Sequence, residues 1–171
     1  RSRALLEAGQ VLLDEGPSGV DESIAVFERL IASGDVSTRT RARAWLALAL
    51  DRGGRGPEAL HVAAAAARQG AAVLVREGDA TSPSFSPLLA TVLAPSAPAA
   101  AAAEYKGWVD RASGSAWLSH GRAKIEALAK QKAIVQPSSS ATPGGTAAKK
   151  RSPGPTAARP APATPIAKKP R

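Results

Sequence analysis

Histidine is the first side chain to consider for catalysis, because its charge changes near neutral pH. The chain has two histidines, His61 and His120, and no cysteine. His61 falls early in an expected helix that has no acidic residue three or four positions later, so a metal site there would need more ligands than the sequence supplies. We therefore expect both histidines to be surface or core-edge residues, and we expect no cofactor and no metal.

Motifs that hold nucleotides or activate nucleophiles are also missing. The sequence contains no GxxxxGK, GxSxG, HExxH or GxGxxG pattern, each of which has a known mechanism. Arg52-Gly53-Gly54-Arg55-Gly56 is similar to an RGG element that contacts RNA, but its glycines are better explained by a turn between helices. The sequence therefore predicts that the protein is not an enzyme.

Cationic side chains gather at the C-terminus. The net charge is +9, and residues 136–171 carry seven basic residues and no acidic one, whereas residues 1–70 carry nine basic and nine acidic residues. The basic residues of this tail are Lys149, Lys150, Arg151, Arg159, Lys168, Lys169 and Arg171. Such clusters release counterions from a nucleic-acid backbone without reading its sequence. The tail is thus expected to bind an acidic partner or nucleic acid, unless it is a solvated linker that contacts nothing.

The composition of residues 136–171 predicts disorder. This tail has eight prolines, three glycines, no aromatic residue and one large aliphatic residue, Ile166, which is too little apolar area to offset the entropy of ordering. It is similar to the Ala/Pro/Lys tails of linker-histone-like proteins, and the resemblance implies contact with phosphate backbones. The Lys149–Arg151 run is compatible with a nuclear address, and Ser152-Pro153 with a phosphorylation switch.

Residues 1–70 show the apolar spacing of paired helices. The first pair is expected at 4–15 and 21–33, with Asp21 as the cap of its second helix and Gly34 after its end. The second pair is expected at 38–52 and 57–69. The first helix is predicted to pack through Leu5, Ala8, Gly9, Leu12 and Leu13, and the next through Ile24, Phe27, Leu30 and Ile31.

The stretch Leu46–Leu60 connects the second pair. It reads LALALDRGGRGPEAL: an apolar helical run, a glycine-rich turn, and Pro57 at the start of the next helix, where its fixed φ is suitable. The stretch resembles the tetratricopeptide repeat family, whose members read Leu-Ala-x-Ala-Leu, three residues, Gly-Arg, two residues, Glu-Ala-Leu. The resemblance implies two stacked helical hairpins that present a surface for protein binding, the first hairpin matching more weakly.

In this family the first helix of each pair lines a concave surface that contacts partners. The matching positions here are Arg3, Leu6, Gln10, Asp14, Arg41, Ala44, Leu48, Asp51 and Arg52. The resemblance also implies that the Lys and Asn clamp of some members, which binds a peptide carboxylate, is absent, because Ala44 and Leu48 stand in those places. A groove mixing arginine with aliphatic residues is expected to suit a segment with acidic and apolar side chains. Alternatively, two repeats form too small a groove and these are ordinary surface residues.

Residues 79–135 are expected to form a loop and a helical cap. Residues 71–77 could form a short helix or a strand, and a helix is favoured because no other strand candidate exists to pair with them. Residues 78–87 are predicted to be a loop. A docking segment with Leu88 and Leu89, a helix after Pro98, and a last helix from 116 to 134 capped by Ser115 follow. The aromatic residues Trp45, Tyr105, Trp108 and Trp117 are expected to be packing anchors.

The fold prediction is therefore all-α: about two tetratricopeptide-like hairpins over 1–78, a loop and helical cap over 79–135, and a disordered basic tail over 136–171. The function predicted is a non-catalytic scaffold or assembly subunit that binds other protein subunits, or alternatively a factor that binds nucleic acid through its tail. Prolines interrupt the uncharged stretch 80–103, so no membrane span is expected. The compartment stays open, with a soluble intracellular or organellar protein favoured. Because the chain begins at Arg1, it is also expected to be processed or a fragment of a longer protein.

Overall fold

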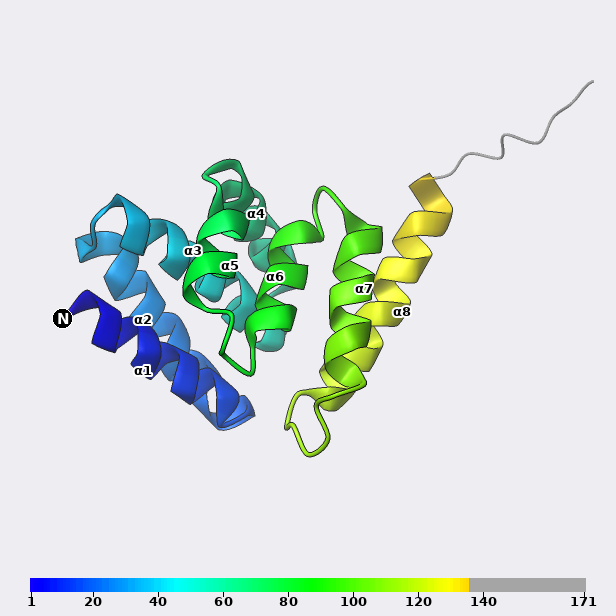
Figure 1. Cartoon of the computed structure of the whole chain (residues 1–171), viewed down its shortest axis with the longest axis horizontal. Coiled ribbons are helices and arrows are strands. Elements are labelled where there is room, and N and C mark those ends of the chain that lie inside the picture. Colours follow the sequence, from blue (N-terminus) through cyan, green and yellow to red (C-terminus); the bar gives the residue numbers. More distant parts are fainter. Residues whose placement is uncertain (136–171) are drawn as a thin grey trace, which may run out of the picture. The chain divides into compact units, whose positions relative to one another are not determined.

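The computed structural model describes the backbone of residues 1–135 and the side chains of residues 1–131. This part of the chain is all-helical, as predicted, and it belongs to one compact unit, Arg1–Pro137 (Figure 1). The expectations for the tail fall outside the described residues. The α-helices are α1 (Ser2–Asp14), α2 (Val20–Ser33), α3 (Val36–Arg52), α4 (Gly56–Arg68), α5 (Ala71–Gly78), α6 (Phe85–Leu93), α7 (Pro98–Val109) and α8 (Leu118–Val135), and a 3-10 turn spans Pro17–Gly19.

The predicted glycine turn separates α3 from α4. α3 ends at Arg52, α4 begins at Gly56, and the two helices pack along each other. Gly54 has a φ of +77°, a left-handed conformation that glycine adopts without steric penalty. Glu58 lies in the first turn of α4, where the helix dipole favours a carboxylate. The helix–turn–helix prediction for Leu46–Leu60 is therefore confirmed.

α3 is the central helix of the described unit, because it packs against α1, α2, α4, α5 and α6. Its N-terminus is capped by Asp35, whose carboxylate accepts a hydrogen bond from the Thr38 backbone N–H at 2.8 Å. Every residue from 44 to 52 is buried. The C-terminal half of α3 therefore has no free face.

The hairpin α1–α2 packs through a face that differs slightly from the predicted one. On α1 the buried residues are Leu6, Gly9 and Leu13, whereas Leu5 and Leu12 are half-buried and Ala8 is exposed. Gly9 faces the ring of Phe27, and a Cβ at this position would lie 2.6 Å from Phe27 Cε1. The small residue at position 9 thus lets α1 approach α2 closely, which sets the rotation of α1.

Two helix starts also differ from prediction. Asp21 lies inside the first turn of α2 and does not cap it, because the helix begins at Val20 after the 3-10 turn. α8 begins at Leu118, two residues later than predicted, and the Ser115 hydroxyl accepts a hydrogen bond from the Trp117 backbone N–H at 3.2 Å. In both cases a short turn directly before the helix changes the residue at which the helix begins.

The segment after α4 consists of two further helix pairs, α5 with α6 and α7 with α8. α6 carries the almost completely buried Leu88, Leu89 and Val92, and it packs on α3, α4 and α7. All four predicted aromatic anchors are buried: Trp45, Tyr105, Trp108 and Trp117. In the described part of the chain, no helix is long and apolar enough to cross a lipid bilayer.

Candidate interaction groove

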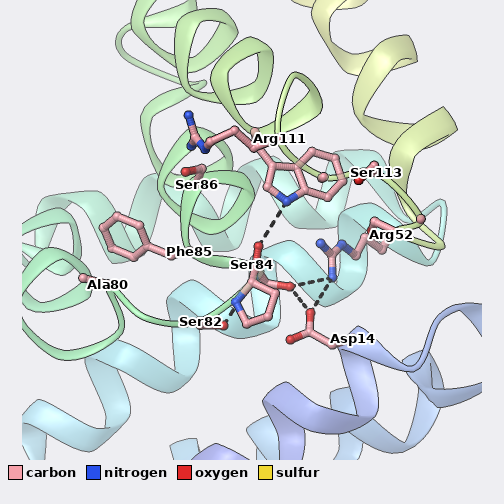
Figure 2. A pocket seen from close by; sticks show the side chains of 14 residues that line it. Asp14, Arg52, Ala80, Ser82, Ser84, Phe85, Ser86, Arg111 and Ser113 are labelled. Carbon is pink, nitrogen blue, oxygen red and sulfur yellow. Dashed lines mark hydrogen bonds and ion pairs between the residues drawn. The ribbon is translucent and has the colours of Figure 1, made fainter.

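Two adjoining hollows contain six of the nine residues that the repeat resemblance assigned to partner binding. The first, the α1 hollow, has a volume of about 560 Å³ and is lined by α1, Arg41 and residues 77–79 and 81–83. The second, the Trp108 hollow, has a volume of about 600 Å³ and is lined by Asp14, Arg52, Ala80, residues 82–86, Trp108 and residues 111–115 (Figure 2). Both are lined by Asp14, Ser82 and Pro83. We call the two together the α1 groove.

The α1 hollow receives five of the predicted residues: Arg3, Leu6, Gln10, Asp14 and Arg41. Four of them come from one helix, because residues spaced by three or four positions lie on the same face. The lining also includes Glu7, Glu77 and Asp79, so four carboxylates stand against two guanidinium groups. The hollow therefore has a net negative lining, which the sequence prediction of a groove for acidic segments did not anticipate.

Asp79 connects three elements at the inner wall of the α1 hollow. Its carboxylate accepts hydrogen bonds from Gln10 Nε2 at 3.3 Å and from Trp45 Nε1 at 3.4 Å. Burial raises the pKa of Asp79, and the nearby Arg41 opposes part of that rise. The Asp79 carboxylate thus holds α1 and α3 to the end of α5.

Arg41 lies beside Asp79 and keeps an unused hydrogen-bond donor. Its guanidinium lies against Gly78, where a Cβ would come within 2.5 Å of the Arg41 Cζ atom. Its Nε is buried and has no hydrogen-bond partner among the described residues. An unsatisfied buried donor is unfavourable by about 1–3 kcal/mol, so a ligand carbonyl or water that reaches this atom would be stabilised.

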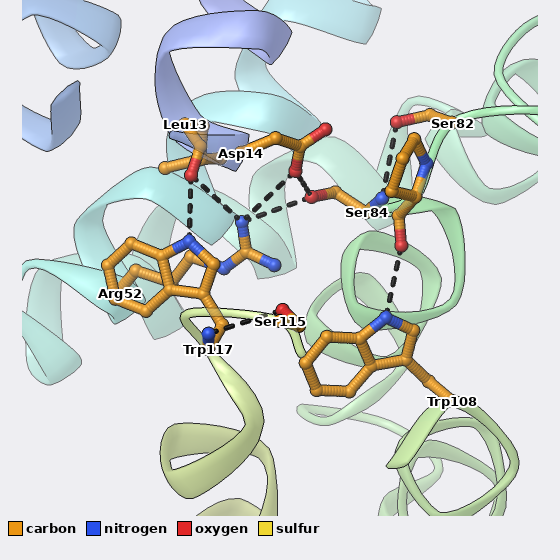
Figure 3. A network of polar contacts seen from close by, with 9 residues as sticks. Leu13, Asp14, Arg52, Ser82, Ser84, Trp108, Ser115 and Trp117 are labelled. Carbon is orange, nitrogen blue, oxygen red and sulfur yellow. Dashed lines mark hydrogen bonds and ion pairs between the residues drawn. The ribbon is translucent and has the colours of Figure 1, made fainter. Parts of the chain in front are cut away.

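The Trp108 hollow is built around a buried polar network. Arg52 Nη1 donates to Ser84 Oγ at 3.0 Å and lies 3.7 Å from Asp14 Oδ1, and the Ser84 hydroxyl donates to the same carboxylate (Figure 3). Trp117 Nε1 donates to the Leu13 carbonyl at 2.7 Å, and the Arg52 Cζ lies 4.8 Å from the centroid of the Trp117 ring. The ends of α1 and α3, the loop before α6 and the segment before α8 therefore meet here.

This network is structural rather than nucleophilic. Burial lowers the pKa of Arg52 to about 10, against the attraction of Tyr105 and Asp14, so the guanidinium stays charged at neutral pH. Ser84 is 1% exposed and has no histidine among its hydrogen-bond partners. A serine nucleophile requires an adjacent base that accepts its proton, and the Asp14 carboxylate here is neutralised by Arg52.

The remaining predicted residues lie beneath the groove or away from it. Ala44 and Leu48 have no exposed surface, because the helices around α3 enclose them. Asp51 is buried under α8, where it pairs with Lys124 and accepts a 2.9 Å hydrogen bond from His120 Nε2 in the appropriate tautomer. The structure therefore corrects the prediction for Ala44, Leu48 and Asp51: Ala44 and Leu48 are fully enclosed, and Asp51 is 5% exposed and lines neither hollow of the α1 groove. Arg52 lines the Trp108 hollow, although its side chain is only 2% exposed.

Sequence reasoning missed the residues that the chain brings from far away. Ser84 joins Asp14 across 70 positions, and His120 joins Asp51 across 69. No local pattern encodes such pairs, since they depend on how the C-terminal helices return to α3. One signal was present in the sequence: Asp51 and Arg52 directly follow the apolar run 46–50, and charges that are buried together with such a run require partners.

The described residues offer no place where three or more acidic or histidine side chains converge as metal ligands do.

Comparisons with protein-family models, curated proteins and solved structures found no significant match to this chain.

Proposed function

We propose that this chain is a non-catalytic protein-interaction subunit that binds an extended segment of a partner protein in the α1 groove. The observation that carries the proposal is that Arg3, Leu6, Gln10, Asp14 and Arg41, assigned by the repeat resemblance, line one continuous hollow. The proposal includes the interpretation that α1–α2 and α3–α4 are tetratricopeptide-like units. Protein-binding grooves between rigid helices commonly receive peptides in this manner.

The charges of the groove favour a basic partner segment. The α1 hollow has an excess of two carboxylates, whereas the Trp108 hollow is lined by Asp14, Arg52 and Arg111 and has an excess of one guanidinium. A segment with lysine or arginine over α1 and a small polar or acidic residue near Arg111 would match both ends. Complementary charge increases the association rate and fixes the orientation of the bound segment.

Peptide display on the immobilised full chain tests this proposal. We expect selected peptides to be rich in Lys and Arg and to lose about tenfold or more in affinity when Glu7 and Glu77 are both changed to Lys. Glu22→Lys with Glu28→Lys is the matched control, because these two residues are exposed on α2 and line neither hollow. Selection of acidic peptides, or equal loss in both double variants, would contradict the proposal.

A second candidate function is binding to a nucleic-acid backbone through the tail. It is favoured by one observation, the seven basic and no acidic residues in 136–171. Deleting 136–171 should lower the salt concentration at which the protein elutes from an immobilised nucleic acid, since fewer counterions are released on binding. An unchanged elution position would eliminate this candidate and leave the groove proposal intact.

A further inference from the structure

A third hollow is lined by none of the residues that line the α1 groove. Its volume is about 380 Å³, within the range of small-molecule sites. Its wall is formed mostly by α4 and α8, with apolar lining from Pro57, Ala59, Leu60, Ala94, Ala127 and Leu128. We call it the α4–α8 slot.

The wall of this slot is apolar and open. Leu60 is a large apolar residue and yet 48% exposed, while Leu128 across the slot is 5% exposed. The lining also includes Ala59, Ala94 and Ala127, whose small side chains leave room for a hydrocarbon group. Burying such a group between two leucines would remove apolar surface from water on both partners.

Two polar side chains that line the slot have spare hydrogen-bond donors, Gln131 and Lys124, and of these two only Lys124 carries a positive charge. The Thr91 and Tyr105 hydroxyl oxygens lie 3.1 Å apart and share a hydrogen bond. Both carboxylate oxygens of Asp51 already have partners, Lys124 for one and His120 for the other. The Lys124 ammonium has three donors, of which Asp51 accepts one, and its side chain is 31% exposed. An incoming anion would therefore meet Lys124.

We propose that the α4–α8 slot binds a small amphipathic carboxylic acid, with its hydrocarbon chain between Leu60 and Leu128 and its carboxylate on Lys124. The apolar wall and the cation at one end match the two parts of such a molecule. Each methylene that enters the slot should tighten binding about fourfold, since its transfer from water is favourable by the usual amount. Affinity should stop rising once the chain exceeds the slot.

The proposal is tested by calorimetric titration of the full chain with hexanoate, octanoate and decanoate. We expect tighter binding along the series, and octanol and octylamine should bind about tenfold more weakly than octanoate, because neither carries a negative charge to pair with Lys124. Absence of octanoate binding, or equal binding of octanol, would overturn the proposal.

Two pairs of variants locate the site. Ala127→Phe should fill the slot and abolish binding, whereas Ala129→Phe, on the same exposed helix but outside the slot, should not. Lys124→Gln should weaken octanoate binding about tenfold, and Lys124→Arg, which keeps the charge, should preserve most of it. Because Lys124→Gln also loosens Asp51, circular dichroism must first show a folded protein. Equal effects of the two phenylalanine variants would overturn the proposal whatever Lys124→Gln does.

Discussion

The repeat resemblance assigned residues of two helices, α1 and α3, to the partner surface, and these two helices differ in how accessible the assigned residues are. On α1, Arg3 and Gln10 face an open hollow, whereas on α3, Ala44 and Leu48 are completely enclosed. The difference arises because α1 packs against α2 and α3, whereas α3 packs against α4, α5 and α6 in addition to α1 and α2. A repeat position thus assigns a residue to a face of its helix, but the neighbouring helices decide whether that face remains open.

The two arginines of α3 show the same contrast within one helix. Arg41, in the N-terminal half of α3, lines the α1 hollow, and its buried Nε has no hydrogen-bond partner among the described residues. Arg52, at the C-terminal end of α3, is paired with Asp14, hydrogen-bonded to Ser84 and packed on Trp117. Arg41 is therefore less tightly bound to the rest of the fold than Arg52.

The largest loss of stability is expected when a buried side chain of α3 is shortened. Leu48→Ala should lower the free energy of unfolding by about 3 kcal/mol, because it leaves a cavity in the core. Leu60→Ala is the control, since this leucine is 48% exposed, and it should change the same quantity by less than about 1 kcal/mol. Urea unfolding of both variants measures the difference, and similar losses would show that α3 is less enclosed than described.

Removing the buried cation should have the next largest effect. Arg52→Met should destabilise the fold by about 2 kcal/mol, since Asp14 and Ser84 lose their partner. Arg41→Met should lower the free energy of unfolding by less than half of that. Adding Asp14→Asn to Arg52→Met should recover part of the lost free energy of unfolding, because no unpaired carboxylate then remains. If the change in the double variant equals the sum of the two single changes, Asp14 and Arg52 do not interact as described.

Acid should weaken the contact between α8 and the C-terminal end of α3. Burial acts to raise the pKa of Asp51, but the His120 hydrogen bond and the attraction of Lys124 together hold it below 3.8. This carboxylate therefore contributes stability that is fully present above about pH 4 and is lost as the pH falls through its folded-state pKa, below 3.8. Asp51→Asn should lower stability at neutral pH by about 1 kcal/mol and remove this part of the acid dependence. Urea midpoints between pH 7 and pH 3 measure both effects, and identical pH profiles would contradict the pairing.

The smallest expected effect concerns the turn between α3 and α4. Gly54→Ala should destabilise the fold by about 1 kcal/mol, because alanine at a φ of +77° is strained. Gly56→Ala, at the start of α4 where a Cβ meets no atom within 4 Å, should be neutral or slightly stabilising. Thermal unfolding of the pair compares them, and a neutral Gly54→Ala would mean that the turn has another conformation.

Much of this fold could be predicted from local signals. Pro57, Pro98 and the glycines before α4 mark helix boundaries, and Phe27 and Leu30 mark a buried face by their spacing. The rotation of α1 was harder to predict, because Leu5 and Leu6 both fit an apolar face and only the contact of Gly9 with Phe27 decides between them. The closure over Asp51 could not be predicted, since it depends on His120 and Lys124 returning from the far end of the chain.

Thiol labelling can compare the accessibility of α1 and α3 in one experiment, because the chain has no cysteine of its own that would react. Val11→Cys would place a thiol in the α1 hollow, at a position that is 59% exposed, and Ala44→Cys would place one in the enclosed part of α3. We predict that Val11→Cys reacts rapidly with a maleimide and is protected by a peptide selected on the full chain, whereas Ala44→Cys reacts slowly with or without the peptide. Rapid labelling of Ala44→Cys, or unchanged labelling of Val11→Cys when the peptide is bound, would contradict the account.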